Sequence, residues 1–237
     1  MVGHFDPETL DYQAGEGMDI LLESWTYMRE NESFFRTALG RHLELSFLSL
    51  GISILVALPL GIWIARHKHA AQYVIHLFNA FRVVPSLAIL FLTLPFLGIG
   101  FLPALVALSV LAFPPILLNT YVGIGEVDPF ILEAARSTGM NRKQLFLQVE
   151  FPLALPAIVT GIRIASVEVI SSATLASFIG GGGLGDFITR GFALYDIPIM
   201  LTGAIPVALL ALLSEGFWTL FLYFSPIHHI SKEDSHA

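Results

Sequence analysis

The feature that most constrains the fold is a long uncharged stretch near the middle of the chain. Residues 86–125 include no Asp, Glu, Lys or Arg. A helix crosses a hydrocarbon core of roughly 30 Å with about 20 apolar residues, so this stretch is too long for one crossing. The motif Gly98-Ile99-Gly100-Phe101-Leu102-Pro103 divides it, because Gly and Pro interrupt helices. The sequence therefore predicts two membrane spans, at about 84–98 and 102–122.

Other apolar runs extend this pattern over most of the chain. They cover residues 43–65, 155–179 and 197–222. Hydrophobic residues make up 55% of the 237-residue sequence and charged residues 13%. The mean hydropathy is +0.74, which is more apolar surface than a water-soluble domain could bury. We therefore expect an all-α polytopic membrane protein with five spans. Residues 71–83, which include Arg82, are expected to form an interfacial lead-in to the second span, with a separate sixth crossing as the alternative.

The distribution of charge predicts the orientation in the membrane. The net charge is −7, and the first 41 residues hold eight acidic residues against three Arg. This composition has no positively charged segment before a short apolar stretch, so we expect no cleaved signal peptide. Arg66 and Lys68 follow the first span, and the positive-inside rule places them in the cytoplasm. The amino terminus is then outside. The loop at 123–153 and the tail are cytoplasmic, and the loop at 180–196 is external.

This orientation divides the chain into three parts. We expect an acidic extracytoplasmic extension at 1–40, a transmembrane domain at 41–224 and a cytoplasmic tail at 225–237. Within the extension, Ile20, Leu21, Trp25 and Met28 predict an amphipathic helical stretch on the outer membrane surface.

The cytoplasmic loop carries the densest ordered polar residues in this apolar chain. Asp128-Pro129 predicts a helix start, because Asp caps exposed amides and Pro suits the first helical position. Gly139 stands where a left-handed cap would end that helix. Asn141 followed by Gln144 predicts a second capped helix, which Pro152 is expected to stop. On the first helix, a small pair of Ala residues would let another surface approach closely, so the loop has the features of a docking knob.

The loop contains an ordered set of residues, Glu133-Ala134-Ala135, Gly139, Val149, Phe151 and Pro152. Their order and spacing resemble the coupling motif of ATP-binding-cassette importer permeases. Phe151 stands where the family usually has Leu, and the change conserves bulk and polarity. The resemblance implies that a set of residues couples this chain to an ATPase: Glu133, Ala134, Ala135, Gly139, Val149 and Pro152.

Further motifs are distributed along most of the chain. They are Ala57-Leu58-Pro59-Leu60-Gly61, Val84-Pro85-Ser86-Leu87-Ala88, Gly98-Ile99-Gly100-Phe101-Leu102-Pro103-Ala104, Val127-Asp128-Pro129, Pro152-Leu153-Ala154-Leu155-Pro156, Ala173-Thr174-Leu175-Ala176 and Gly182-Gly183-Leu184-Gly185-Asp186. Over about residues 37–222, they make the chain similar to permeases for glycine betaine, carnitine and choline. The resemblance implies a type I importer in a bacterial or archaeal inner membrane. Its partners would be a second permease, identical or paralogous, two cytoplasmic ATPases and an external solute-binding protein, with membrane lipid around it and no nucleic acid.

Alternative functions follow from the same sequence. The same importer class could carry another small zwitterion or an amino acid, and a channel or secondary carrier would need no ATPase. No G-x-x-x-x-G-K-[ST] phosphate loop is present, so we expect the partner ATPase to use ATP and Mg and this chain to bind no cofactor. Cysteine is absent, and the His residues lack carboxylates at ligand spacing, so no metal site is expected.

The external loop is rich in glycine and formally contains a G-x-G-x-x-G spacing. No strand precedes it, so a dinucleotide site is not expected. Two interpretations remain for this segment, a flexible re-entrant or external turn, or a loop that meets the binding protein or lines the outer mouth. Its candidate residues are Gly182, Gly183, Gly185 and Asp186.

Ionisable residues within the predicted spans point to the protein interior or a water-filled cavity, because they are costly in lipid. Glu168 lies near the middle of its span, and its alternatives are a pathway or intersubunit role, a structural pair, or a protonated bystander. Arg163, closer to the cytoplasmic end, is expected to snorkel. Glu215 and Arg82 are expected to form structural pairs. The pathway candidates are Glu168, Arg163, Pro85 and Ser86.

Overall fold

The computed structural model describes residues 7–224, and every regular element in this range is helical. In chain order the elements are α1 (Pro7–Glu30), α2 (Glu32–Ala65), α3 (Lys68–Val83), α4 (Ser86–Leu97), α5 (Phe101–Gly125), α6 (Pro129–Ser137), α7 (Arg142–Leu145), the π-helical turn η1 (Phe146–Glu150), α8 (Phe151–Ser172), the 3-10 helix η2 (Ala173–Ile179), α9 (Gly185–Leu194) and α10 (Ile197–Phe224). The expected all-α fold is confirmed. The predicted tail at 225–237 lies outside the described residues.

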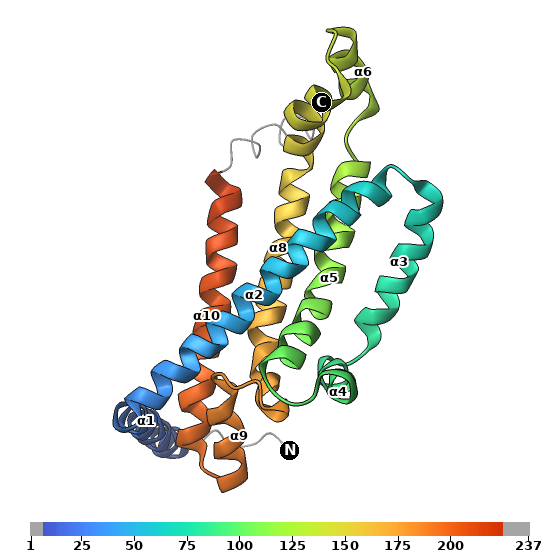
Figure 1. Ribbon diagram of the computed structural model, residues 1–237. Helices are drawn as coiled ribbons and strands as arrows, with labels where there is room; N and C mark the ends of the chain where they lie inside the picture. Colours follow the sequence, from blue (N-terminus) through green and yellow to red (C-terminus); the bar gives the residue numbers. More distant parts are fainter. Residues whose placement is uncertain (1–6, 225–237) are drawn as a thin grey trace, which may run out of the picture.

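The long helices α2, α5, α8 and α10 run between two ends of the molecule (Figure 1). α6 projects beyond one of them, here called the α6 end. α1, α4 and α9 lie at the opposite end, here called the α9 end. α5 packs extensively against both α2 and α8, and α10 packs against α8, α9 and α1.

Small residues let α5 approach its two neighbours closely. A Cβ atom added to Gly61 of α2 would lie 2.7 Å from the Cβ of Thr120, and one added to Gly161 of α8 would lie 2.7 Å from the Cβ of Asn119. Both separations are shorter than a Cβ contact tolerates, so only glycine fits at these two crossings. Close backbone approach stabilises helix pairs in lipid, where burial of apolar surface gives little driving force. Ile116 of α5 is fully buried between these contacts.

Four helical segments in the described range are long and apolar enough to cross a membrane. They are Glu32–Ala65, Phe101–Gly125, Arg142–Ile179 and Ile197–Phe224. The expected span at 84–98 is the helix α4, but α4 has only 12 residues. At 1.5 Å per residue it is about 18 Å long, too short to cross the hydrocarbon core alone.

The return from α2 to α5 is therefore built from two helices. α3 runs beside α5 from the α6 end toward the α9 end, where α4 lies against η2 (Figure 1). The sequence predicts one straight span preceded by an interfacial segment, and the structure corrects this to two helices, α3 and α4. Pro85 is the physical reason, because its backbone at φ −56° and ψ 138° separates α3 from α4.

Helix α1, the first element that the structure describes, packs on the bundle at the α9 end. The hydroxyl groups of Ser24 in α1 and Thr202 in α10 lie 3.2 Å apart and are buried. Tyr27 meets the ring of Phe187 of α9 edge-on, at 6.4 Å between ring centroids. The predicted helical stretch is thus present as part of α1, and Trp25 on it is 58% exposed.

Candidate functional site

The polar loop folds as the local sequence predicts. The Asp128 carboxylate accepts a hydrogen bond from the Phe130 N–H at 2.8 Å, and Pro129 occupies the first turn of α6. The Gly139 N–H donates to the carbonyl oxygen of Arg136 at 2.9 Å, and Gly139 has φ +86°. A positive φ is the conformation for which glycine is preferred, so the Gly turn is confirmed.

A capping box starts the second helix of the loop. The Asn141 side chain accepts hydrogen bonds from the N–H groups of Lys143 and Gln144, at 3.0 and 2.9 Å. In return, the Asn141 N–H donates to the Gln144 side chain at 3.0 Å. These contacts fix where α7 begins and hold it at a defined angle to α6.

The face of α6 has the properties of a docking surface. Phe130 is 80% exposed although it is large and apolar, and Ile131 is also exposed. Glu133 and Ala134 are exposed and Ala135 is half-buried. α6 projects beyond the bundle, with its main contacts on α7 and η1 (Figure 1). An apolar, protruding surface of this kind is typical of an interaction site.

Pro152 does not end the second helix, which is a correction to the expectation from sequence. The Phe151 N–H donates to the carbonyl oxygen of Phe146, five residues earlier, so η1 is a π-helical turn. This turn shifts the hydrogen-bond register before the proline, and helix continues through it. Residues Arg142–Ile179 form one continuous helical segment. Val149, half-buried within the turn, is thus part of a rod that joins the loop to α8.

A second connection joins the loop to α2. The guanidinium of Arg66, which caps the carboxyl end of α2, donates to the Glu150 carboxylate at 2.9 Å. The same guanidinium lies over the Phe146 ring, 4.8 Å from its centroid. The sequence indicates only an orientation for Arg66, because Arg66 and Glu150 are 84 positions apart and no local pattern shows their pairing. Both residues line a cleft of about 710 Å³ together with Arg136, Met140, Asn141, Arg142 and Leu145.

Three of the four pathway candidates lie around one cavity. Pro85 and Ser86 from the start of α4 and Glu168 from α8 line a space of about 250 Å³. The wall on the α5 side includes Pro114. This cavity will be called the α4–α5–α8 cavity. Its lining is completed by Val83, Val84, Ile89, Val110, Leu111 and Ser172.

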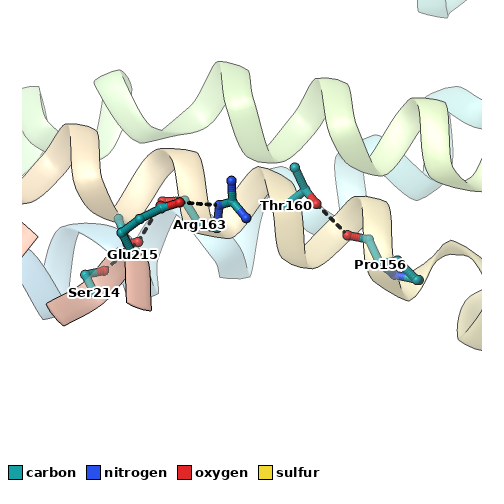
Figure 2. Close-up of polar contacts among 6 residues, drawn as sticks. Pro156, Thr160, Arg163, Ser214 and Glu215 are labelled. Carbon is teal, nitrogen blue, oxygen red and sulfur yellow. Dashed lines mark hydrogen bonds and ion pairs between the residues drawn. The ribbon is translucent and has the colours of Figure 1, made fainter. Parts of the chain in front are cut away.

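Arg163, the fourth candidate, has a different environment. Its Nε lies 3.1 Å from a carboxylate oxygen of Glu215 on α10 (Figure 2). One turn along, the hydroxyl groups of Ser166 and Ser214 lie 2.9 Å apart. Five residues separate Arg163 from Glu168, which places them about 140° apart around a helix. The expected pairing of Glu215 is confirmed, whereas the expected snorkelling of Arg163 is replaced by an ion pair between helices.

The glycine-rich segment is packed rather than loose. Gly182 and Gly183 have φ +77° and +104°, and Gly183 and Gly185 are buried. A Cβ on Gly185 would lie 2.0 Å from the carbonyl oxygen of Thr174, so the chain passes η2 too closely for any side chain. The expectation of a flexible turn is therefore wrong for these residues, because close packing fixes them.

Charged residues surround this segment at the α9 end. Arg41 of α2 donates to the carbonyl oxygen of Gly181 at 3.4 Å and lies 3.9 Å over the centroid of the Phe101 ring. Asp186 lines a cleft of about 400 Å³ with Arg41, Glu44 and neighbouring residues. Burial raises the pKa of the Asp186 carboxyl above its ordinary value.

Proteins of similar sequence align with most of this chain. The carnitine transport permease protein OpuCB of Listeria monocytogenes is 45% identical over 190 residues, which are 80% of this chain and 87% of that protein. The glycine betaine/carnitine/choline transport system permease protein OpuCB of Bacillus subtilis is 43% identical, over 80% of this chain and 88% of that protein. The osmoprotectant import permease protein OsmY of Salmonella typhimurium is 40% identical over 78% of each.

Solved structures share the fold. A chain of the MetNI methionine ABC transporter in an inward-facing conformation superposes with a TM-score of 0.73 at 23% identity, covering 81% of this chain and 96% of that one. Residues 57–222 match the protein family described as binding-protein-dependent transport system inner membrane component. With a match of this length, and relatives above 40% identity, the chain belongs to the family of binding-protein-dependent transport system inner membrane components.

Proposed function

We propose that this protein is the membrane permease of an ATP-driven importer for a small compatible solute, a quaternary ammonium osmoprotectant such as glycine betaine, carnitine or choline. Relatives named for these solutes support the substrate class. The observation that carries the importer mechanism is α6, a protruding helix with an exposed apolar face, which the Gly139 turn connects to the helical segment that enters the membrane bundle.

In this proposal the α6 end faces the cytoplasm and the α9 end, with α1, faces outward. Residues 1–40, 41–224 and 225–237 keep the roles of external extension, transmembrane domain and cytoplasmic tail. Two ATPase subunits receive α6 and its counterpart in a second permease, identical or paralogous. ATP and Mg act in the ATPases, and an external binding protein delivers the solute to the α9 end.

Coupling begins at α6, where Glu133 and Ala134 are exposed to a partner. Closure of the ATPase dimer displaces α6, and the Gly139 turn with the Asn141 capping box passes the displacement to α7. From there the motion takes two routes, along the rod into α8 and through the Arg66 ion pair into α2. Because α5 is held tightly between α2 and α8, movement of both neighbours changes access to the α4–α5–α8 cavity.

The experiment that tests this proposal is Gly139→Pro in the complex reconstituted into proteoliposomes with its ATPase and binding protein. Pro fixes φ near −65°, whereas Gly139 has φ +86°, so the turn cannot form. We expect solute uptake to fall at least about tenfold and the binding protein to lose its stimulation of ATP hydrolysis. Glu133→Ala should act in the same direction by removing a polar contact with the ATPase.

Gly125→Ala is the matched control, because an added Cβ there meets nothing within 4 Å. Normal uptake and normal stimulation in Gly139→Pro would contradict the coupling role. Uptake that continues without any copurifying ATPase would instead indicate a channel or secondary carrier. If amino acids inhibit radiolabelled uptake and quaternary ammonium solutes do not, the substrate class would be amino acids.

A further inference from the structure

Positive charge gathers in the cleft of about 710 Å³ at the α6 end, which will be called the basic cleft. Its charged lining residues are three arginines and one glutamate, namely Arg66, Arg136, Arg142 and Glu150. Arg66 is paired with Glu150 at 2.9 Å. Among the side chains that the structure describes, no carboxylate lies within ion-pair distance of Arg136 or Arg142. The basic cleft therefore has two guanidinium groups available for an anionic ligand.

The ends of two membrane spans place the basic cleft at the level of the membrane surface. Arg66 directly follows the span Glu32–Ala65, and Arg142 is the first residue of the segment Arg142–Ile179. Trp63, one turn before Arg66, is 48% exposed. An exposed Trp near the end of a span is typical of the membrane–water interface. The cleft thus lies at the depth of the lipid head groups.

The basic cleft is separate from the apolar face of α6. Around that helix, Phe130, Ile131 and Ala134 lie within about 100° of one another. Arg136 lies at least about 120° from each of them, and it lines the cleft instead. A protein that docks on the apolar face therefore need not cover the cleft, where both Arg136 and Arg142 are exposed.

We propose that the basic cleft binds the phosphate group of an anionic phospholipid. A guanidinium group forms two parallel hydrogen bonds with phosphate, and neither Arg136 nor Arg142 has a carboxylate that competes for them. Basic pockets between membrane helices bind anionic head groups in this way. The cleft volume lies within the range of about 300–1,000 Å³ that is usual for small ligands, so it admits a phosphate with its glycerol.

A bound phosphate would also connect separate elements of the structure. Arg66 lies at the end of α2, Arg136 in α6 and Arg142 at the start of α7. A phosphate shared among them would hold the polar loop against the bundle, next to the ion pair of Arg66. This inference goes beyond the proposed function, because it requires a chain that spans a membrane but no particular solute.

The test is native mass spectrometry of the full chain in detergent, both alone and in complex with its ATPase. The probes are phosphatidylglycerol and phosphatidylcholine with the same acyl chains, so that only the head groups differ. We expect one phosphatidylglycerol to remain on each copy of the chain, bound about twentyfold more tightly than phosphatidylcholine. Arg142→Gln should weaken its binding about fivefold and Arg136→Gln/Arg142→Gln about twentyfold, because each Arg near an anionic lipid adds a similar increment.

Lys143→Gln is the matched control. Lys143 is exposed on α7 beside Arg142 but does not line the cleft, so the loss of its charge should leave phosphatidylglycerol binding unchanged. An equal loss in Lys143→Gln and Arg142→Gln would indicate diffuse attraction to a basic loop and would overturn the site. Arg142→Lys keeps the charge without the planar fork, so it should retain part of the binding.

A second variant decides the question if the double variant does not fold. Met140→Glu keeps every Arg and adds a carboxylate to the cleft lining. We expect it to weaken phosphatidylglycerol binding about fivefold, because the new charge repels the phosphate. Unchanged binding in Met140→Glu would overturn the proposal.

Free phosphate and a protein partner are the competing occupants of the cleft. If inorganic phosphate at the same concentration displaces phosphatidylglycerol, the cleft takes free phosphate and the lipid assignment fails. If the chain alone retains phosphatidylglycerol and the complex with its ATPase does not, the cleft belongs to the protein interface and the proposal is overturned. Retention in both states, without displacement by phosphate, supports the lipid site. None of these results decides the proposed function, which depends on solute uptake in proteoliposomes.

Discussion

The ion pair between Arg66 and Glu150 is predicted to carry part of the movement of α6 into α2. The test is a double-mutant cycle with Glu150→Gln, Arg66→Gln and the double variant. Each single change removes one charge and keeps a polar side chain, of equal length for Glu150→Gln and shorter for Arg66→Gln. If the pair transmits movement, each single variant should lower the amount of solute transported per ATP hydrolysed, and the double variant should lower it no further.

The expected magnitude follows from the geometry of the pair. Two unit charges at about 4 Å attract by about 4 kcal/mol at an effective dielectric constant of about 20 and by about 1 kcal/mol in water. The closest N–O distance is 2.9 Å, and the side chains are 49% exposed for Arg66 and 15% for Glu150. Solvent screening at the more exposed partner favours the lower value, so we expect a coupling energy of about 1 kcal/mol. That energy corresponds to about a fivefold change in the transport ratio.

The assay measures ATP hydrolysis and solute uptake in the same proteoliposomes. Glu32→Gln and Arg36→Gln supply the control, because this pair lies one turn apart on α2 with side chains 62% and 76% exposed. The control cycle should give no coupling energy. Independent, additive losses in the Arg66 and Glu150 cycle would refute the reasoning. So would a lower melting temperature with an unchanged transport ratio, which indicates a structural role only.

Two further predictions concern packing and protonation. Gly161→Ala should destabilise the protein by about 1–3 kcal/mol, because the new Cβ would lie 2.7 Å from the Pro115 carbonyl oxygen. Thermal unfolding in detergent should show this loss, whereas Gly216→Ala, with nothing within 4 Å, should melt like the wild type. Because the pKa of Asp186 is raised above 3.8, its protonation stabilises the folded state below pH 3.8, and this contribution is lost as the pH rises through the raised pKa. With Asp186→Asn, the melting temperature should fall less steeply as the pH rises through the raised pKa. An unchanged pH dependence would contradict the raised pKa of Asp186.

The polar loop was predictable because its signals are local. Asp128, Gly139 and the Asn141 box each act through hydrogen bonds to residues within three positions, and all three form as expected. The continuation of helix through Pro152 was missed, because a π-helical turn depends on a shift of register that no residue type marks.

Features that depend on contacts distant in sequence were harder to predict. Hydropathy predicts α4 as a full membrane crossing. Apolarity alone does not show that Pro85 divides the chain between α2 and α5 into two helices. The partners of Arg66 and Arg163 come from other helices, so only the fold could supply them. Motif and charge indicate Pro85, Ser86 and Glu168 separately, and the fold brings them around one cavity. Helical periodicity alone could have separated Glu168 from Arg163.

The continuous helical segment Arg142–Ile179 also relates the two faces of the membrane to each other. Its 38 residues span about 57 Å, from the base of the polar loop to the start of the glycine-rich segment. If this segment tilts about a point between its ends, the two ends move in opposite directions. Linkage then works in both directions, because occupancy at either tip must change affinity at the other by the same factor. A ligand at the α9 end that favours one tilt would thus change the affinity of the exposed α6 surface for a partner before that partner binds.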